Sequence, residues 1–284
     1  MKKIIILITV MVTYFTAAAA EKENCYKDNI AGADVYICSV KDNNLTTKIL
    51  LSDNKEVIDY NSKVNPKGYM ENKHNVMIIK KGKNNILVDT GFADTISSLK
   101  NALKTSGLEF KDITHIILTH AHFDHIGGLV QNEKAVFPNA DIYINEKEYE
   151  YFCKSDLSKV SGSVKKSMEN VRNILSKYNG RIKYYTEGII DNNIKEITSI
   201  AAYGHTPGHS LINIKDKNKS LLFIADLFHI YNVQIKYPET TVSFDMDKNA
   251  AFKKREEILK KYKGTNTQIT GSHTPFSAPV LWKK

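Results

Sequence analysis

The sequence contains few cysteines, with 3 in 284 residues, and none of them lies near a histidine motif. This scarcity argues against a metal site built from thiolates. In an oxidising compartment, Cys25 and Cys38 can pair across a short hairpin, which leaves Cys153 free. No stretch rich in Gly, Pro or Ser resembles a linker, and no internal repeat is present. We therefore expect one domain with one sizeable core.

Basic residues outnumber acidic ones, but they do not follow a nucleic-acid-binding pattern. The formal net charge is +9. Most of the excess is lysine in scattered pairs such as Lys80-Lys81 and Lys165-Lys166, which is typical of a solvated surface. The interleaved aromatic residues of a single-strand binding groove are missing. We therefore expect no nucleic-acid partner.

An apolar run at residues 4–15 follows two lysines and precedes the small residues 16–20. This order predicts a secretory signal peptide at residues 1–20 and a mature domain at residues 21–284. The run is short for a membrane span, so a retained anchor is the alternative. Polar residues before Cys25 argue against a lipoprotein. We expect an exported protein, periplasmic or secreted, without stable membrane association after signal cleavage.

The stretch His120-Ala121-His122-Phe123-Asp124-His125 places four metal-competent side chains within six residues. It follows the apolar run Ile116-Ile117-Leu118, which predicts a buried strand. Alternate residues of a strand face the same side, so we expect His120 and His122 to share one metal. Asp124 and His125 come where the chain turns, and we expect them to reach a second metal.

Three more polar residues follow apolar, strand-like segments. His205 stands in the turn Gly204-His205-Thr206-Pro207-Gly208-His209, where proline and glycine exclude a helix. Asp226 ends the run 221–225, and a carboxylate at the end of a buried strand is costly unless it is paired. His273 follows the short segment 268–270. Because catalytic groups on α/β sheets collect at strand ends, we expect these residues to meet.

These motifs resemble those of the metallo-β-lactamase superfamily, whose pattern is His-x-His-x-Asp-His, then a His, a bridging Asp and a last His. The segments 204–210, 225–227, 233–234, 244–247 and 137–140 are similar to the methyl parathion hydrolase and quorum-quenching lactonase branch. The resemblance runs from about Val76 to His273. It implies an α/β fold, the four-layer αβ/βα sandwich. It also implies one metal held by His120, His122 and His205, another held by Asp124, His125 and His273, and Asp226 bridging both.

The sequence departs from this pattern in two places. The lactonases often carry a substrate-polarising Tyr three residues after the bridging Asp, and His229 stands there instead. We interpret His229 as a hydrogen-bond donor to the substrate or a proton donor to the leaving group; a packing or surface histidine is the alternative. The family also usually continues past its last metal-binding His with further strands, so we expect a shortened final sheet edge.

The implied chemistry is that of a dinuclear metal-dependent hydrolase with a small-molecule substrate. Two divalent ions sharing a water lower its pKa to roughly 7, which supplies hydroxide for attack on an ester or lactone carbonyl. Imidazole and carboxylate suit Zn²⁺ best, and Mn²⁺, Fe²⁺ or Co²⁺ can occupy such ligands. Asp124, Asp226 and His229 are the catalytic candidates. The alternatives are phosphotriester hydrolysis, a β-lactamase, a nuclease, and a non-hydrolytic diiron redox or binding protein. A homodimer is also possible.

Other expectations concern the secondary structure and the residues around the site. We expect a hairpin from residues 35–40 and 46–51, strands at 76–79, 86–88 and 141–144, and helices at 96–106 and 250–262 and before Gly180. Asp89, at a strand end, is expected to orient a metal-binding His or to cap a turn. Gly127-Gly128 lets backbone pack tightly beside the ions.

The segment 146–185 is interpreted as a lid or substrate wall, with plain packing of its aromatic residues as the alternative. Phe92, His229 and Phe276 are further wall candidates. His209 is expected to support the metal site or the substrate, and His74 and His115 are interpreted as structural.

Overall fold

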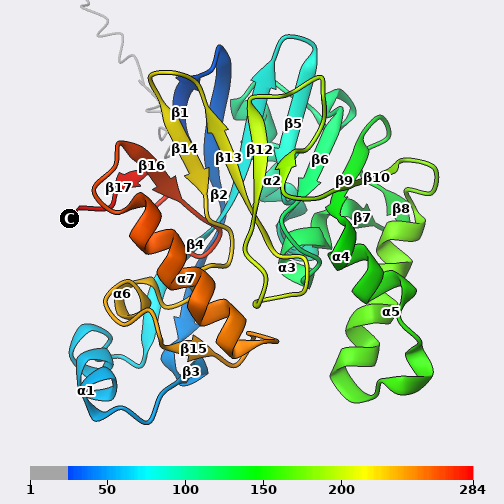
Figure 1. The fold of residues 1–284 in the computed structure, drawn as a ribbon. Coiled ribbons are helices and arrows are strands. Elements are labelled where there is room, and N and C mark those ends of the chain that lie inside the picture. The colour runs from blue at the N-terminus through cyan, green and yellow to red at the C-terminus, as the bar shows by residue number, and fades with distance from the viewer. Residues whose placement is uncertain (1–24, 284) are drawn as a thin grey trace, which may run out of the picture.

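The computed structural model describes residues 25–283. Two mixed β-sheets pack face to face, and helices cover their outer faces (Figure 1). This is the four-layer α/β sandwich that the resemblance implied. Residues 1–20, where the signal peptide is predicted, lie outside the described residues. Within residues 25–283, no helix is both long and apolar enough to cross a membrane.

The first sheet has seven strands in the order β1-β2-β4-β5-β6-β9-β10. Their bounds are Cys25–Ile30, Ala33–Thr46, Tyr69–Lys81, Asn84–Val88, His115–Leu118, Asp141–Asn145 and Ile182–Tyr185. The strands from β5 to β10 run parallel, while β1, β2, β4 and β5 are antiparallel neighbours. The expected strands at 76–79, 86–88 and 141–144 are confirmed. Parallel strands present their carboxyl ends at one edge, and the loop after β6 leaves from that edge.

The second sheet has six strands in the order β11-β12-β13-β14-β16-β17. Their bounds are Gly188–Ile189, Ile197–Ala201, Ser210–Lys215, Ser220–Phe223, Thr267–Thr270 and Val280–Leu281. Strands β14 and β16 are parallel neighbours, so the residues that follow each of them emerge at the same sheet edge. The outer edge on that side is the two-residue β17.

Three apolar clusters hold the four layers together. Between the sheets, residues such as Ile79, Ile117 and Phe223 are fully buried. Helices α2 (Ile96–Thr105) and α5 (Gly162–Ser176) pack on the first sheet, and α7 (Lys248–Tyr262) packs on the second. Each large aliphatic side chain buried in this way contributes roughly 1.5–3 kcal/mol to stability.

Short elements complete the chain around these layers. A fourth apolar cluster joins α1 (Lys55–Val64) and α6 (Tyr231–Gln234) beside the strand pair β3 (Leu50–Leu51) and β15 (Thr241–Val242). The pair β7 (Val130–Gln131) and β8 (Lys134–Ala135) follows the helical turn α3 (Phe123–Ile126). Another turn, α4 (Glu146–Tyr149), follows β9.

The predicted helices are present, with small shifts at their ends. The apolar side chains of Leu99 and Leu103 in α2 are buried, as their spacing predicted. Helix α7 begins before Ala250 because the Asp247 side chain accepts a hydrogen bond from the Ala250 backbone N–H at 2.9 Å. A carboxylate at this position satisfies a backbone donor that the first turn leaves unpaired.

The N-terminal hairpin differs from the prediction. Strand β2 pairs with β1 before it and with β4 after it, and residues 47–49 form a 3₁₀ turn rather than a partner strand. The prediction of a hairpin from residues 35–40 and 46–51 was therefore wrong. The pairing of Cys25 with Cys38 is confirmed as a disulfide between facing residues of β1 and β2, and Cys153 is free.

Candidate metal centre

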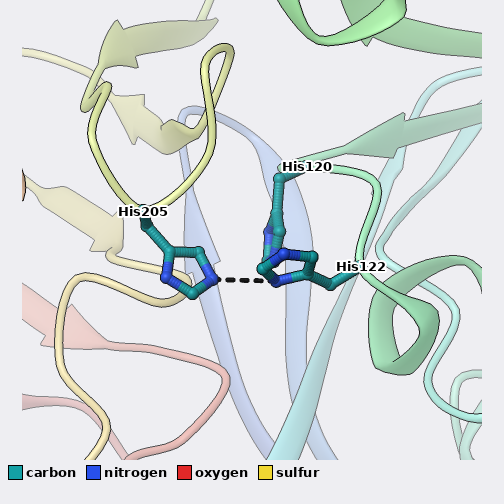
Figure 2. A group of neighbouring side chains, drawn as sticks. All are labelled: His120, His122 and His205. Atoms are coloured by element: carbon teal, nitrogen blue, oxygen red, sulfur yellow. Dashed lines mark hydrogen bonds between the residues drawn. The ribbon is translucent and has the colours of Figure 1, made fainter. Parts of the chain in front are cut away.

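His120 and His122 lie in an extended loop past the end of β6, not on the strand itself. Both rings face the same point, as predicted. The predicted reason, alternation of side chains along a strand, was wrong. His205 approaches from the turn after β12, and Figure 2 shows the three rings turned toward one another. His205 Nε2 lies 3.0 Å from His122 Nδ1, and each of the three offers a nitrogen atom within 4.8 Å of the others.

The other predicted ligands form a second group beside the first. Asp124 and His125 open the helical turn α3, Asp226 follows β14, and His273 follows β16. Ligand atoms of all four lie within 4.8 Å of one another. Asp226 Oδ1 is 3.1 Å from His125 Nε2, and Asp226 Oδ2 is 3.1 Å from His273 Nε2 and 3.5 Å from His205 Nε2. Asp226 therefore faces both groups, as a bridging carboxylate must.

Buried atoms without hydrogen-bond partners indicate which kind of ligand these residues can bind. His120 Nε2, His125 Nε2 and Asp226 Oδ1 are buried without a hydrogen bond, and the last two face each other in an ion-pair contact at 3.1 Å. Leaving such groups unpaired costs about 1–3 kcal/mol each, more when they are charged. Divalent cations coordinated by imidazole and carboxylate would satisfy all of them at once, and this donor set suits Zn²⁺. The residues present therefore fit a pair of metal ions.

The protonation states of the histidines differ between the two groups. Burial lowers the pKa of His122 to about 4 and holds the pKa of His120 well below its ordinary value, so both carry a free lone pair at neutral pH. At His273 burial also opposes the charge, but the Asp226 and Asp124 carboxylates outweigh it and raise the pKa to about 9. A cation in the second group takes the place of such a proton, so metal binding here is coupled to proton release.

Asp89 holds one of these histidines, as the sequence suggested. Its Oδ2 atom lies 2.8 Å from His125 Nδ1, while both carboxylate oxygens accept hydrogen bonds from Thr119. Asp89 has a positive φ of 59°, a conformation that surrounding structure must enforce in a residue other than glycine. The contact directs His125 Nε2 toward Asp226 and fixes which nitrogen is free to bind metal.

A buried ion pair supports His205 in a similar way, and the sequence analysis missed it. Asp245 Oδ1 lies 3.1 Å from His205 Nδ1, and Arg255 of α7 lies 3.5 Å from the other carboxylate oxygen. Although burial favours the neutral acid, His205 and Arg255 hold the pKa of Asp245 well below its ordinary value. Asp245 stands in the Phe-Asp-Met-Asp motif that carried part of the resemblance. No sequence signal marked Arg255.

His209 supports the bridging residue instead of facing the substrate. Its Nε2 accepts a hydrogen bond from the Asp226 backbone N–H at 3.2 Å, so the ring proton must be on Nδ1, which faces the Ala202 carbonyl oxygen at 2.9 Å. His74 is also fully buried, in ring contact with Phe92, His125 and His273. It therefore packs against the site, whereas His115 stacks on Tyr143, away from the predicted ligands.

Two glycine pairs allow backbone to approach the site closely. A Cβ atom on Gly128 would lie 2.3 Å from the Thr90 carbonyl oxygen, and one on Gly127 would lie 2.5 Å from a backbone nitrogen. This confirms the tight packing expected beside the metal motif. A Cβ atom on Gly208 would lie 2.4 Å from the backbone nitrogen of Glu148, and Gly204 packs as closely against α7. No larger residue fits these positions without displacing backbone.

A cavity of about 260 Å³ opens beside the metal ligands. Its wall contains Phe92 and His229, as predicted. It also contains residues that the sequence analysis missed: Asn43, Leu45, Phe123 and Phe244. Phe123 is 65% exposed and Phe244 is 47% exposed, which places both at the cavity mouth.

Two of the wall predictions are not borne out. Phe276 packs on Tyr231 and does not line this cavity. The segment 146–185 contributes no residue to the wall either, because its aromatic residues, such as Phe152, pack on the first sheet. The alternative interpretation of that segment, plain packing, is the one that holds.

His229 occupies the position between the metal ligands and the open cavity. Its Nε2 lies 3.2 Å from Asp226 Oδ2, and its ring stacks on that of His273 at a centroid distance of 5.1 Å. The His229 backbone N–H donates to Gln234 Oε1 at 2.8 Å, which fixes the start of the loop. His229 is buried, so it is not the surface histidine that was the alternative.

Comparison with known proteins agrees with this geometry. The family model of the metallo-beta-lactamase superfamily matches residues 70–262. The hydrolase AbOPH of the β-lactamase superfamily is 25% identical with a TM-score of 0.80, covering 91% of this chain and 92% of that one. AidC, a dizinc quorum-quenching lactonase in complex with its product N-hexanoyl-L-homoserine, is 26% identical with a TM-score of 0.80, covering 91% and 93%.

Two relatives show the same similarity at the level of sequence. A probable metallo-hydrolase of Methanocaldococcus jannaschii is 30% identical over 173 residues, which cover 60% of this chain and 73% of the relative. The N-acyl homoserine lactonase AttM of Rhizobium radiobacter is 28% identical over 139 residues, which cover 49% of this chain. That match spans about half of the lactonase, 47% of its length.

Proposed function

Because this chain belongs to the metallo-β-lactamase superfamily and is a metal-dependent hydrolase, we propose that it hydrolyses a lactone or another ester of a small molecule. The observation that carries the proposal is the convergence of seven predicted ligands on one point beside a cavity. The similarity to AidC, a dizinc lactonase, supports this substrate class and supports zinc as the metal.

The ligand assignment follows from the two groups of side chains. His120, His122 and His205 would hold one ion, and Asp124, His125 and His273 would hold the other, with Asp226 shared between them. When bound, such a pair supplies a water of lowered pKa as nucleophile and polarises the oxygen under attack. Asp226 faces both groups and sets their separation, while Asp124 adds negative charge to the second.

The cavity wall accounts for how the substrate is held. Phe92, Phe123 and Phe244 present rings to the cavity, so an apolar acyl or aryl group is bound there and water is excluded from the ester. His229 is at the boundary between this wall and Asp226. A ring nitrogen there donates a hydrogen bond to the substrate oxygen or a proton to the leaving alkoxide.

Two measurements test the proposal. Elemental analysis of protein purified without chelator should give two metal ions per chain; one ion or none in folded protein would refute the two-metal assignment. Turnover of an N-acyl homoserine lactone, a phosphotriester and a β-lactam should then be compared, with the Asp226→Asn variant as the background. We expect the lactone to be hydrolysed fastest. Turnover of all three at the background rate would refute the proposed substrate class.

A further inference from the structure

Glu148 is a fully buried carboxylate whose hydrogen-bond donors all come from the two loops that carry the first group of histidines. It stands in the helical turn α4, directly after β9. It neither lines the substrate cavity nor belongs to the groups of candidate ligands. In the sequence, Glu148 falls within the segment 146–185, and no motif there predicts a role for it.

Each oxygen of this carboxylate contacts a different loop. Oε1 accepts a hydrogen bond from the Ala121 backbone N–H at 2.8 Å, and Ala121 stands between His120 and His122. Oε2 accepts from the Thr206 hydroxyl at 2.8 Å and from the Gly208 backbone N–H at 2.7 Å. One side chain therefore joins the loop after β6 to the loop after β12.

Besides Glu148, one backbone hydrogen bond joins these two segments, from the Ser210 N–H at the start of β13 to the Thr119 carbonyl oxygen, at 3.0 Å. Glu148 adds the contacts to Ala121, Thr206 and Gly208, which lie beside the histidines themselves. His122 and His205 are 83 residues apart and follow strands of different sheets. The turn α4 provides a rigid base for the connection, because Asn145 Oδ1 caps it by accepting from the Lys147 backbone N–H at 3.0 Å. Gly208 fits against this turn only because it lacks a Cβ atom, which would lie 2.4 Å from the Glu148 nitrogen.

Burying the Glu148 carboxylate costs free energy, which also indicates that this residue has a specific role. Burial raises the pKa of its carboxyl to about 7, although all three hydrogen bonds act in the opposite direction. A buried carboxylate whose bonding partners are neutral donors destabilises the fold relative to an apolar side chain of the same size. Short bonds to an ionised acceptor are, however, about twice as strong as neutral ones and more directional. They suit a contact that must fix two loops.

We propose that Glu148 is a positioning residue that sets the spacing of the two loops and so forms the metal site of His120, His122 and His205. This inference rests on the proposed function, since it takes the site to bind metal. The second site has a different support, because His125 is held by Asp89 and not by Glu148. Loss of Glu148 therefore weakens one metal site and leaves the other unchanged.

The test is a zinc titration of the metal-free Glu148→Gln variant against a chromophoric chelator. The amide keeps the size of the side chain, but whichever way it faces, it presents an NH₂ group to the N–H of Ala121 or of Gly208. We expect one zinc ion to bind about ten- to a hundredfold more weakly than in the wild type and the other to bind with wild-type affinity. Cadmium-113 NMR then shows which of the two resonances is lost.

Two further variants make the outcome decisive. Thr206→Val removes one of the three bonds and should weaken the same ion by a smaller factor, which provides the test if Glu148→Gln does not fold. Ser199→Ala removes a buried hydroxyl that donates to the Thr186 carbonyl at 2.6 Å, away from both loops, and should leave both zinc affinities unchanged.

Folded Glu148→Gln protein that binds both ions with wild-type affinity would overturn the inference. Equal weakening of both ions would also overturn it, because that result indicates general loosening of the fold. Wild-type protein that binds no zinc would instead refute the proposed function itself.

Discussion

His229→Ala is the most informative change for the proposed chemistry, because it leaves every proposed metal ligand in place. His229 lies on the cavity wall with its Nε2 3.2 Å from Asp226 Oδ2. Alanine removes the imidazole and retains the backbone N–H that bonds to Gln234. The change therefore tests what the ring does for the reaction and disturbs the loop little.

The expected loss follows from the strength of one hydrogen bond. A hydrogen bond to a group that carries charge contributes about 1.5–3 kcal/mol. If the imidazole makes such a bond only as negative charge develops on the substrate oxygen, its loss raises the barrier by that amount. Each 1.36 kcal/mol is a factor of ten in rate. We therefore expect kcat to fall roughly ten- to a hundredfold, with KM nearly unchanged.

The assay compares His229→Ala and His229→Tyr with the wild type on the lactone substrate, at equal metal content. Tyrosine restores the group that lactonases often carry at this position, and its hydroxyl should recover part of the lost kcat. Wild-type kcat and pH profile in the alanine variant, with two ions bound, would show that His229 only packs against His273. A change in metal content would instead make His229 a ligand.

Three further predictions follow. Asp226→Asn should lower turnover about a hundredfold and leave the far-UV circular dichroism unchanged, because the change removes negative charge shared by both metal groups. Activity within twofold of the wild type would show that Asp226 has no role in the reaction and only ends the strand. Reduction of the Cys25–Cys38 disulfide, which closes a loop of sequence separation 13, should lower the free energy of unfolding by about 3 kcal/mol, measured by urea denaturation with and without reductant. An equal midpoint in both conditions would contradict this. We also propose that the protein is exported, so N-terminal sequencing of material from the native envelope should begin close to Glu21; an intact Met1 on membrane-bound protein would favour a retained anchor.

The candidate ligands could be picked out in the sequence, and they come together in the structure, because metal chemistry restricts ligands to a few residue types at strand ends. His205, Asp226 and His273 follow β12, β14 and β16, where the apolar runs before them placed the strand ends. The reason given for the alignment of His120 and His122 was wrong because β6 ends at Leu118, and strand alternation does not extend into a loop.

The supporting residues were harder to predict, because they act over long sequence separations. Glu148 in the short turn α4 and Arg255 in the long helix α7 look like ordinary charged helix residues, and only the packed structure buries them. The cavity wall was missed for the same reason. Leu45 of β2 and Phe244 meet beside the metal ligands from segments far apart in sequence, and neither segment has a periodicity that points to a substrate.

The division of the histidines between two sheets has a consequence for how the protein is synthesised. His122 leaves the ribosome 83 residues before His205. At about 5–20 residues per second, this interval lasts roughly 4–17 s. During that time the nascent chain contains His120 and His122 without His205, and Glu148 has only one of its three hydrogen-bond donors, the Ala121 N–H. We therefore expect metal to bind after the chain has been completed.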